Sequence, residues 1–213
     1  MDIAAMVDHV RASIRAAKRR RSGLTPGALA IDGMSSPKVR HLLNNLCSMP
    51  GCRYLEVGSW KGSTLVSALL GNGVERAVAI DNFSEFGAPR EEFAANCREH
   101  LDPGGHAFVD ADCFSVDPLL LGGPFNVYLY DGAHDAGSQI RAFTHFDGAL
   151  ADPFVAVVDD WNVPRVRAGT REAFGRLGYS PAFEAELPAR RNGDMRRWWN
   201  GLYVAAVRKG GGA

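Results

Sequence analysis

The sequence predicts an α/β protein with an open, doubly wound sheet. The sheet is mostly parallel, ends in an antiparallel strand near the C-terminus and has helices on both faces. Short apolar runs of strand length alternate with segments of helical periodicity through most of the chain, which favours a parallel sheet covered on both faces. The last two apolar runs follow each other without a helix between them, which favours an antiparallel pair. The 213 residues suffice for one domain with a sizeable core.

Residues 1–50 are expected to form one or two helices before the first strand. Apolar side chains recur at helical spacing over residues 2–21, at Ile3, Met6, Val10 and Ile14. Residues 23–33 have the composition of a loop. A second helix is expected to run to about Leu46, capped by a serine that precedes Pro37. These helices would cover a sheet face or form a lid over a ligand.

Residues 51–209 are expected to form the main domain, in which strands and helices alternate. After a first strand that begins at Tyr54, strands are expected at residues 76–80, 106–110, 125–130, 154–158, 181–187 and 201–207. Helices are expected at residues 65–70, 90–100, 136 to about 150, and 167–177. The glycine tail at residues 210–212 is expected to be disordered.

The stretch from Tyr54 to Gly62 has the pattern of a strand end, a glycine turn and a helix start. Gly58 and Gly62 permit φ > 0 or a close approach of a ligand to the backbone, and the helix start offers free N–H groups. Trp60 stands where a dinucleotide-binding turn has its second glycine, and the phosphate-loop motif is absent from the sequence. Glu56 would repel a phosphate but attract an amine. The stretch therefore predicts a small-molecule cradle of another kind.

Acidic residues follow other predicted strands as well. Asp81 ends the second strand about 20 residues beyond the glycine turn, where α/β nucleotide sites have an acid that binds ribose hydroxyls. Asp112 follows the third strand beside Cys113 and Phe114, an arrangement that could hold an adenine amine and the face of its ring. Each of these features, taken singly, is also typical of an ordinary turn.

Together the strand ends place six carboxylates at one edge of the sheet, because the carboxyl ends of parallel strands meet there. They belong to Glu56, Asp81, Asp112, Asp131, Asp159 and Asp160. Without a counter-charge they would repel one another and raise each other's pKa. A cationic ligand, a hard metal ion with oxygen ligands, or both are therefore expected among them.

Composition excludes several classes of function. Lys+Arg and Asp+Glu both number 24, so no bulk attraction for nucleic acid is expected. No apolar run approaches the roughly 18 residues of a membrane span, and the N-terminus lacks the apolar region of a secretory signal. The four cysteines form no Cys-x-x-Cys pair, so we expect reduced thiols in a cytoplasmic protein. The sequence leaves the oligomeric state open, including a homo-oligomer.

By motif over residues 54–162, and by element order over the whole chain, the sequence resembles the class I S-adenosylmethionine-dependent methyltransferases, a Rossmann-like family. Residues 56–62 match the Asp/Glu-x-Gly-x-x-x-Gly motif of that family, and Asp81 matches its ribose-binding acid. The resemblance implies that S-adenosyl-L-methionine is the cofactor. The residues it assigns to cofactor binding are Glu56, Gly58, Ser59, Trp60, Gly62, Ser63, Asp81, Asn82, Asp112, Cys113, Phe114 and Asp131.

A finer resemblance concerns a metal. Asp131, Asp159 and Asp160 are similar in spacing to the three ligands of the magnesium-dependent catechol-type O-methyltransferases, and the Asp pair resembles that of sugar O-methyltransferases. This implies methyl transfer to a hydroxyl of a small-molecule acceptor, assisted by Mg²⁺ or another divalent metal. The catechol-type enzymes have a lysine as base where this sequence has His134. His134 or Asp131 is therefore the expected proton acceptor.

Other functions remain open. A nucleotide-dependent oxidoreductase would have a similar topology, although Trp60 speaks against its glycine fingerprint. A non-catalytic module could bind S-adenosylmethionine through the same fold, and an enzyme could methylate without a metal with His134 alone as base. Three tryptophans could line an apolar acceptor pocket, or pack in the core or in a dimer interface; they are Trp161, Trp198 and Trp199.

Overall fold

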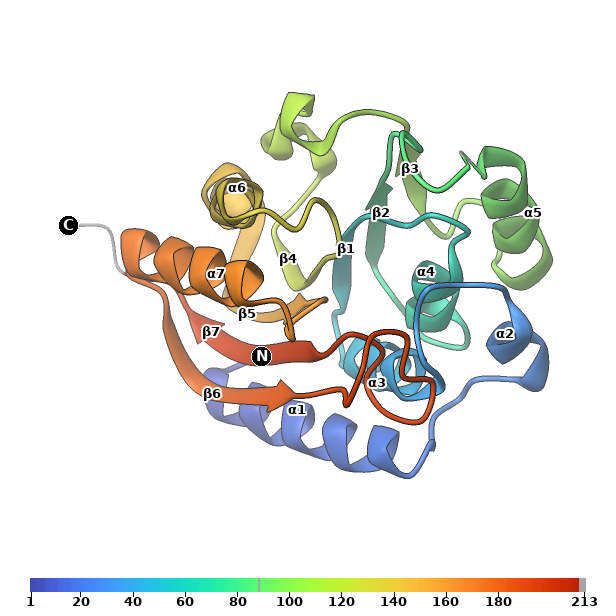
Figure 1. Cartoon of the computed structure of the whole chain (residues 1–213), viewed down its shortest axis with the longest axis horizontal. Helices are drawn as coiled ribbons and strands as arrows, with labels where there is room; N and C mark the ends of the chain where they lie inside the picture. Colours follow the sequence, from blue (N-terminus) through green and yellow to red (C-terminus); the bar gives the residue numbers. More distant parts are fainter. Residues whose placement is uncertain (88, 211–213) are drawn as a thin grey trace.

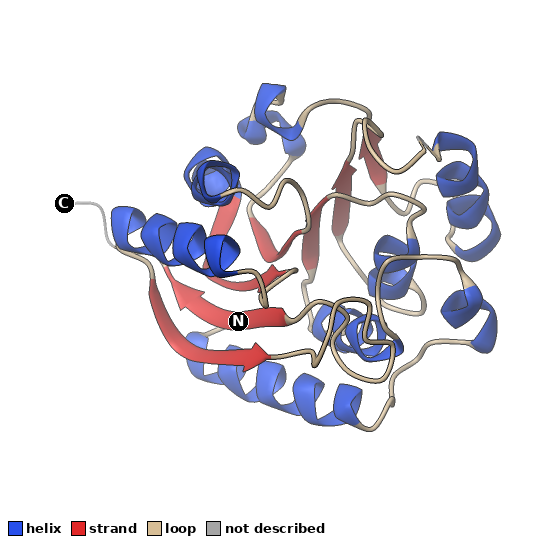
Figure 2. Ribbon diagram, in the orientation of Figure 1, coloured by secondary structure: helices blue, strands red, loops and turns tan. Residues whose placement is uncertain are grey.

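The computed structural model describes residues 1–87 and 89–210 and has a seven-stranded sheet between layers of helices (Figures 1 and 2). The strands are β1 Arg53–Val57, β2 Arg76–Ile80, β3 Ala107–Val109, β4 Phe125–Tyr130, β5 Leu150–Val158, β6 Ser180–Leu187 and β7 Leu202–Arg208. Their spatial order is β3-β2-β1-β4-β5-β7-β6. The first five strands are parallel, and β7 lies antiparallel between β5 and β6. The predicted fold class is confirmed.

Helices occupy most of the chain between the strands. They are α1 Ile3–Lys18, α2 Pro26–Ala30, α3 Pro37–Cys47, α4 Ser63–Leu69, α5 Arg90–His100, α6 Ala136–Phe146 and α7 Pro164–Leu177, with short 3₁₀ turns η1 Cys113–Ser115, η2 Pro118–Leu121 and η3 Asp147–Ala149. Side-chain caps fix several helix starts. Ser36 accepts a hydrogen bond from the Val39 amide at 3.4 Å ahead of Pro37, as the sequence predicts for α3.

Two expectations about local structure are wrong. Residues 23–33 contain the short helix α2, because Thr25 accepts a hydrogen bond from the Ala28 amide at 3.2 Å and Pro26 suits a first helical turn. The strand expected at residues 154–158 begins earlier: β5 starts at Leu150, directly after the helical stretch of α6 and η3, which ends at Ala149. The early start of β5 comes from pairing with Phe125 of β4, a long-range contact that local periodicity does not reveal.

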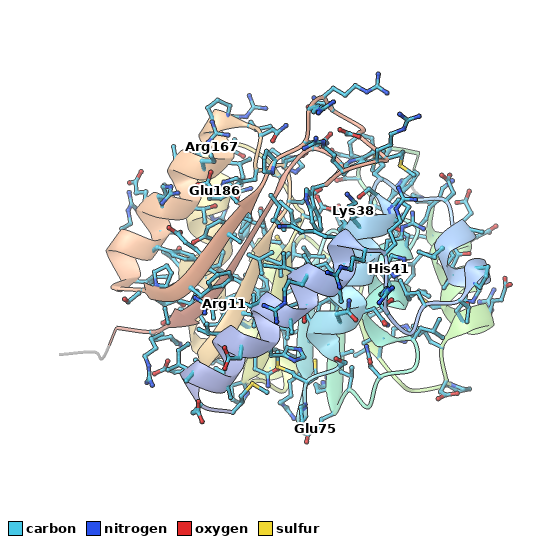
Figure 3. All side chains as sticks on the ribbon, turned by 90° about the horizontal axis from the view of Figure 1, so that it is seen from below. Arg11, Lys38, His41, Glu75, Arg167 and Glu186 are labelled. Carbon is cyan, nitrogen blue, oxygen red and sulfur yellow. The ribbon has the colours of Figure 1, made fainter. Side chains whose placement is uncertain are left out.

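Two apolar layers hold the sheet. Helices α1, α3, α4 and α5 lie on one face of the sheet, and α6 and α7 lie on the other (Figure 1). Figure 3 shows α1 lying along the first of these faces, where the Arg11 guanidinium sits 4.9 Å from the ring centroid of Phe183 on β6. Helices α1 and α3 therefore cover a sheet face, whereas Ala28 of α2 packs in a separate cluster with Val66 of α4.

Within the described residues, α1 is the longest helix, and no helix combines the length and the apolar character that crossing a bilayer requires. Of the glycine tail expected to be disordered, Gly210 is among the described residues, and residues 211 and 212 lie outside them.

Candidate functional site

The carboxyl ends of the parallel strands surround a cavity of about 630 Å³. It lies where the strand order reverses between β1 and β4, the usual ligand position in open α/β sheets. Its volume is in the range of small-molecule sites, roughly 300–1,000 Å³. Most of the predicted site residues line it, namely Gly58, Trp60, Asp81, Asn82, Asp112, Cys113, Phe114, Asp131, His134, Asp159 and Asp160.

Gly58 allows the ends of β1 and β4 to approach each other. Its φ is +86°, and a Cβ at this position would stand 2.0 Å from the Asp131 carbonyl oxygen. The Gly58 amide donates to the carbonyl of Ile80 at 2.9 Å, and the Asp131 amide donates to that of Val57 at 2.8 Å. The first glycine of the predicted cradle is therefore required by both its backbone conformation and its neighbours.

Asp81 links the glycine turn to the loop after β2. One of its carboxylate oxygens accepts hydrogen bonds from the amides of Ser59 and Trp60, both at 2.8 Å. The other accepts from the Phe83 amide at 2.7 Å. A carboxylate has about four acceptor sites, so roughly one is left for a ribose hydroxyl. The structure thus gives Asp81 a positioning role that the sequence did not reveal.

The segment after β3 forms another wall of the cavity. The Asp112 carboxylate accepts a hydrogen bond from the Phe114 amide at 2.8 Å and so starts η1. The guanidinium of Arg141, from α6, lies 3.9 Å from the centroid of the Phe114 ring. Arg141 also lines the cavity, but nothing in its sequence surroundings marks it, because α6 and η1 meet only in the folded chain.

Several predicted cofactor residues lie behind the turn instead. The cavity lining within the described part of the chain does not include Glu56, Ser59, Gly62 or Ser63. Glu56 is 0 % exposed and accepts hydrogen bonds from the hydroxyls of Tyr54 at 2.5 Å and Thr64 at 3.1 Å. Strand alternation turns Glu56 toward α4, and its neighbour Val57 toward the cavity. Burial raises the pKa of Glu56 to about 7, against the opposing effect of these hydrogen bonds.

The ends of β4 and β5 bring three carboxylates and one imidazole together. We call Asp131, His134, Asp159 and Asp160 the carboxylate cluster. His134 Nε2 lies 2.8 Å from an oxygen of Asp160 and 3.6 Å from one of Asp131. These contacts are ion pairs without hydrogen-bond alignment, because Nε2 has no hydrogen-bond partner of good geometry among the described residues. All four residues line the same cavity.

Burial and mutual repulsion set the charges of the carboxylate cluster. Burial, together with the charges of Asp131 and Asp160, raises the pKa of Asp159 well above its ordinary value. Burial also raises the pKa of Asp131 to about 6. For His134 burial favours the neutral form, but the adjacent Asp131 and Asp160 outweigh it and raise the pKa to about 10. At neutral pH the imidazolium is therefore the positive group that faces these carboxylates.

The carboxylate cluster fits a hard cation in its chemistry. One oxygen each of Asp159 and Asp160 is shielded from solvent and has no hydrogen-bond partner in the described part of the chain, and carboxylate oxygens are the ligands that Mg²⁺ prefers. As the side chains stand, no group of three or more His, Cys, Asp or Glu residues within residues 1–87 and 89–210 is arranged to hold a metal ion. The donor types fit a cation, while the imidazole of His134 lies against the other oxygen of Asp160 and an oxygen of Asp131.

Backbone strain is concentrated at this cavity. Four non-glycine residues that line it have left-handed φ values: Trp60 at 44°, Phe86 at 54°, Asp160 at 55° and Trp199 at 58°. Such conformations cost about 1–3 kcal/mol each and cluster at functional sites. Sequence reasoning left Phe86 without a role, although the Trp60 indole donates a 3.0 Å hydrogen bond to its carbonyl.

The structure places the three tryptophans in different surroundings. Trp161 is buried and stacks on Tyr203 with ring centroids 4.2 Å apart, and Trp198 is also buried. Trp199 lines the cavity. It belongs to the loop of residues 188–201, in which the buried Asp194 accepts a 3.0 Å hydrogen bond from the Arg196 amide and pairs with Trp199 through its backbone.

The N-terminal segment also reaches the cavity, through Met34. The buried guanidinium of Arg40 donates a 2.7 Å hydrogen bond to the Ile31 carbonyl and a 2.9 Å bond to the Ser35 hydroxyl. Lys61 of the glycine turn forms a 2.8 Å ion pair with Asp32. These contacts fix the loop of residues 31–36 beside the turn. The remaining polar lining residues that sequence reasoning missed are Ser84, Glu85, Tyr130, Ser138 and Asn200.

No family model and no curated protein sequence matches this chain. Solved structures do match. One is SMU.776, described as a methyltransferase and complexed with SAH (S-adenosylhomocysteine), with 17 % identity and a TM-score of 0.62 over 83 % of this chain and 50 % of that one. This chain thus spans about half the length of that protein.

Two other structures match over nearly their whole length. An O-methyltransferase from Bacillus cereus in complex with SAH has 16 % identity and a TM-score of 0.58, over 96 % of this chain and 91 % of that one. A protein from Pyrococcus horikoshii described as an RNA methyltransferase has 12 % identity and a TM-score of 0.58, over 94 % and 96 %. At these identities the likeness shows the fold: the chain has the Rossmann-like fold of S-adenosylmethionine-dependent methyltransferases.

Proposed function

We propose that the chain is an S-adenosylmethionine-dependent methyltransferase that transfers the methyl group to a hydroxyl of a small molecule, assisted by a divalent cation. The observation that carries the proposal is the meeting of the glycine turn at Gly58 and the acidic strand ends around one cavity. The shared fold supports the choice of cofactor, since two of the similar structures contain SAH.

The cavity offers complementary groups for each part of the cofactor. The carboxylates at the strand ends attract its amine and sulfonium charges. The free acceptor site of Asp81 and the neighbouring Asn82 suit the ribose hydroxyls. Asp112 and the ring of Phe114 suit adenine, and Arg141 supports that ring from α6.

The acceptor would lie beside the carboxylate cluster. Methyl transfer from a sulfonium requires an acceptor oxygen in line with the S–CH₃ bond, so catalysis is mostly positioning. Met34, Trp199 and Asn200 line the cavity and would bound the acceptor. Cofactor and acceptor share about 630 Å³, which favours a small acceptor. The zero net charge gives no bulk attraction for RNA, although the fold also occurs in a protein described as an RNA methyltransferase.

The acceptor hydroxyl must lose its proton as the C–O bond forms. A divalent cation held by Asp131, Asp159 and Asp160 would lower the pKa of a hydroxyl bound to it. Asp131 and His134 are the candidates for the proton acceptor because both belong to the carboxylate cluster. An imidazolium has no free lone pair, so His134 serves as base only in its neutral form.

Turnover of the Asp159→Asn variant tests this assignment. With Mg²⁺, S-adenosylmethionine and a panel of hydroxylated acceptors, we expect the variant to lose more than about tenfold in turnover, a typical loss for a perturbed metal site. Asp152→Asn is the matched control, because Asp152 is an exposed carboxylate at the opposite end of the same strand. Undiminished turnover by Asp159→Asn would remove the metal role. Cofactor binding without turnover of any acceptor would favour a non-catalytic binding module.

A further inference from the structure

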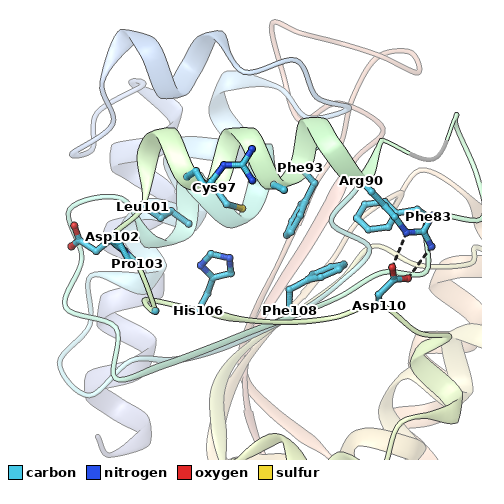
Figure 4. A pocket seen from close by; sticks show the side chains of 13 residues that line it. Phe83, Arg90, Phe93, Cys97, Leu101, Asp102, Pro103, His106, Phe108 and Asp110 are labelled. Atoms are coloured by element: carbon cyan, nitrogen blue, oxygen red, sulfur yellow. Dashed lines mark hydrogen bonds and ion pairs between the residues drawn. The ribbon is translucent and has the colours of Figure 1, made fainter.

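A second cavity, of about 560 Å³, lies between α5 and β3 at the edge of the sheet (Figure 4). Within the described residues it shares no lining residue with the cavity at the strand ends. The proposed methyl transfer makes no use of it. Its volume is also within the range of small-molecule sites, roughly 300–1,000 Å³.

Three phenylalanines from three elements form its apolar wall. Phe83 follows β2, Phe93 belongs to α5 and Phe108 to β3. Their ring centroids are 4.5–5.7 Å apart in tilted and edge-on arrangements. Leu101 lines the same cavity near the end of α5. Aromatic rings at these separations and angles favour another ring in the same cluster.

The imidazole of His106 supplies a polar group to the cavity. His106 Nδ1 is shielded from solvent and has no hydrogen-bond partner among the described residues. Figure 4 shows the imidazole facing α5, below Cys97 and Leu101. Burial lowers the pKa of His106, so at neutral pH the ring is uncharged. Because Nδ1 is shielded, a hydroxyl in the cavity would bond to the other ring nitrogen, Nε2, and it could do so in either tautomer, since a hydroxyl both donates and accepts.

The charges at the cavity rim sum to zero, because Arg98 and Asp102 line it with opposite charges and Arg90 and Asp110 pair with each other. The Arg90 guanidinium forms a two-pronged pair with Asp110, at 2.7 and 2.9 Å. The same guanidinium lies 5.0 Å from the ring centroid of Phe83. Because this charge pair is already compensated, the cavity favours a neutral ligand over a charged one.

We propose that this cavity binds a small, neutral aromatic alcohol, whose ring packs among Phe83, Phe93 and Phe108 and whose hydroxyl bonds to His106. Such a ligand matches the apolar wall, the neutral imidazole and a rim without net charge. The site is separate from the proposed methyl-transfer site, and its occupancy does not depend on that proposal.

Calorimetric titration of 2-naphthol into the full chain tests the assignment. We expect saturable binding near one per chain, with a Kd of roughly 0.1–1 mM for so small a ligand. Ala94→Phe places a ring inside the cavity that Ala94 lines and should weaken binding at least about tenfold. Ala95→Phe is the matched control, because Ala95 is the next residue of α5, is exposed and does not line the cavity. Its affinity should stay within about twofold of the parent chain.

A second variant keeps the test decisive if Ala94→Phe does not fold. His106→Leu preserves the apolar wall but removes the hydrogen bond, which should weaken 2-naphthol binding by about two- to tenfold. Circular dichroism and thermal melting establish that each variant is folded. The assignment is overturned if 2-naphthol shows no saturable binding up to its solubility, or if a folded Ala94→Phe or His106→Leu binds it as tightly as the parent chain.

Discussion

Glu56 is an ionisable residue that is completely buried. The free energy of unfolding therefore depends on pH through this residue. It lies under the glycine turn, where the hydroxyls of Tyr54 and Thr64 donate hydrogen bonds to it. Burial raises its pKa from 4.5 to about 7. Between these values the unfolded chain releases a proton that the folded chain keeps. The stability associated with this group is therefore fully present below about pH 4.5 and is lost as the pH rises through about 7.

We expect Glu56→Gln to remove this dependence. The free energy of unfolding of the parent chain minus that of the variant should fall by roughly 3 kcal/mol between pH 4.5 and pH 8, at about 1.4 kcal/mol per pKa unit. Urea unfolding of both chains at a series of pH values measures this difference, in which the other titrating groups cancel. A difference that stays constant over this range would show that Glu56 has an ordinary pKa.

The sequence predicted which strand-end acids line the cavity better than it predicted the residues that contact the ligand site from other segments. Asp81, Asp131 and Asp159 line one cavity as expected, because the carboxyl ends of parallel strands must meet. Glu56 was placed at the same edge, but strand alternation turns it away from the cavity. Arg141 had no local signal, since its contact with Phe114 joins two distant segments.

The glycine turn after β1 is the element on which the cavity depends most. At Gly58 a Cβ would stand 2.0 Å from the Asp131 carbonyl, with φ at +86°. Gly71 also has a left-handed φ, +73°, but a Cβ there would have nothing within 4 Å. Alanine substitutions at the two glycines therefore separate the energetic cost of the backbone conformation from the cost of steric overlap.

We expect Gly71→Ala to cost only the backbone strain, about 1–2 kcal/mol of unfolding free energy, and to leave SAH affinity unchanged. Gly58→Ala adds the overlap with the Asp131 backbone, so it should cost more and weaken SAH binding at least about tenfold, because the cavity wall must shift. Urea unfolding and calorimetry measure the two effects. Equal losses of stability and of SAH affinity in both variants would contradict the packing argument.

Elements with strong local periodicity or a cap could be predicted, and elements fixed by long-range contacts could not. The start of α3 follows from Ser36 and Pro37. The loop of residues 188–201 has no periodic signal, yet it is fixed by distant partners. The Ser36 hydroxyl donates to the Arg197 carbonyl at 2.6 Å, and the Asn162 amide group donates to the Ala189 carbonyl at 2.9 Å. These contacts bring Trp199 to the cavity. The local sequence does not predict this position, because the contacts join distant segments of the chain.

On the scale of the whole molecule, topology makes the site. The reversal of strand order between β1 and β4 opens a crevice at the carboxyl ends of the strands. Helices α1 and α3 cover one sheet face, and the loop between α2 and α3 adds Met34 to the crevice wall. The alternation of strands and helices predicted this topology, whereas the cavity between α5 and β3 depends on how side chains pack and had no counterpart in the sequence pattern.

The central claim is that the cavity at the strand ends binds S-adenosylmethionine. Calorimetric titration of SAH into the purified chain, with and without Mg²⁺, tests it most directly. We predict binding near one SAH per chain, weakened by Gly58→Ala and retained by Gly71→Ala. Absence of SAH binding at high concentration, with the chain folded, would contradict the assignment of the cavity and with it the proposed methyl transfer.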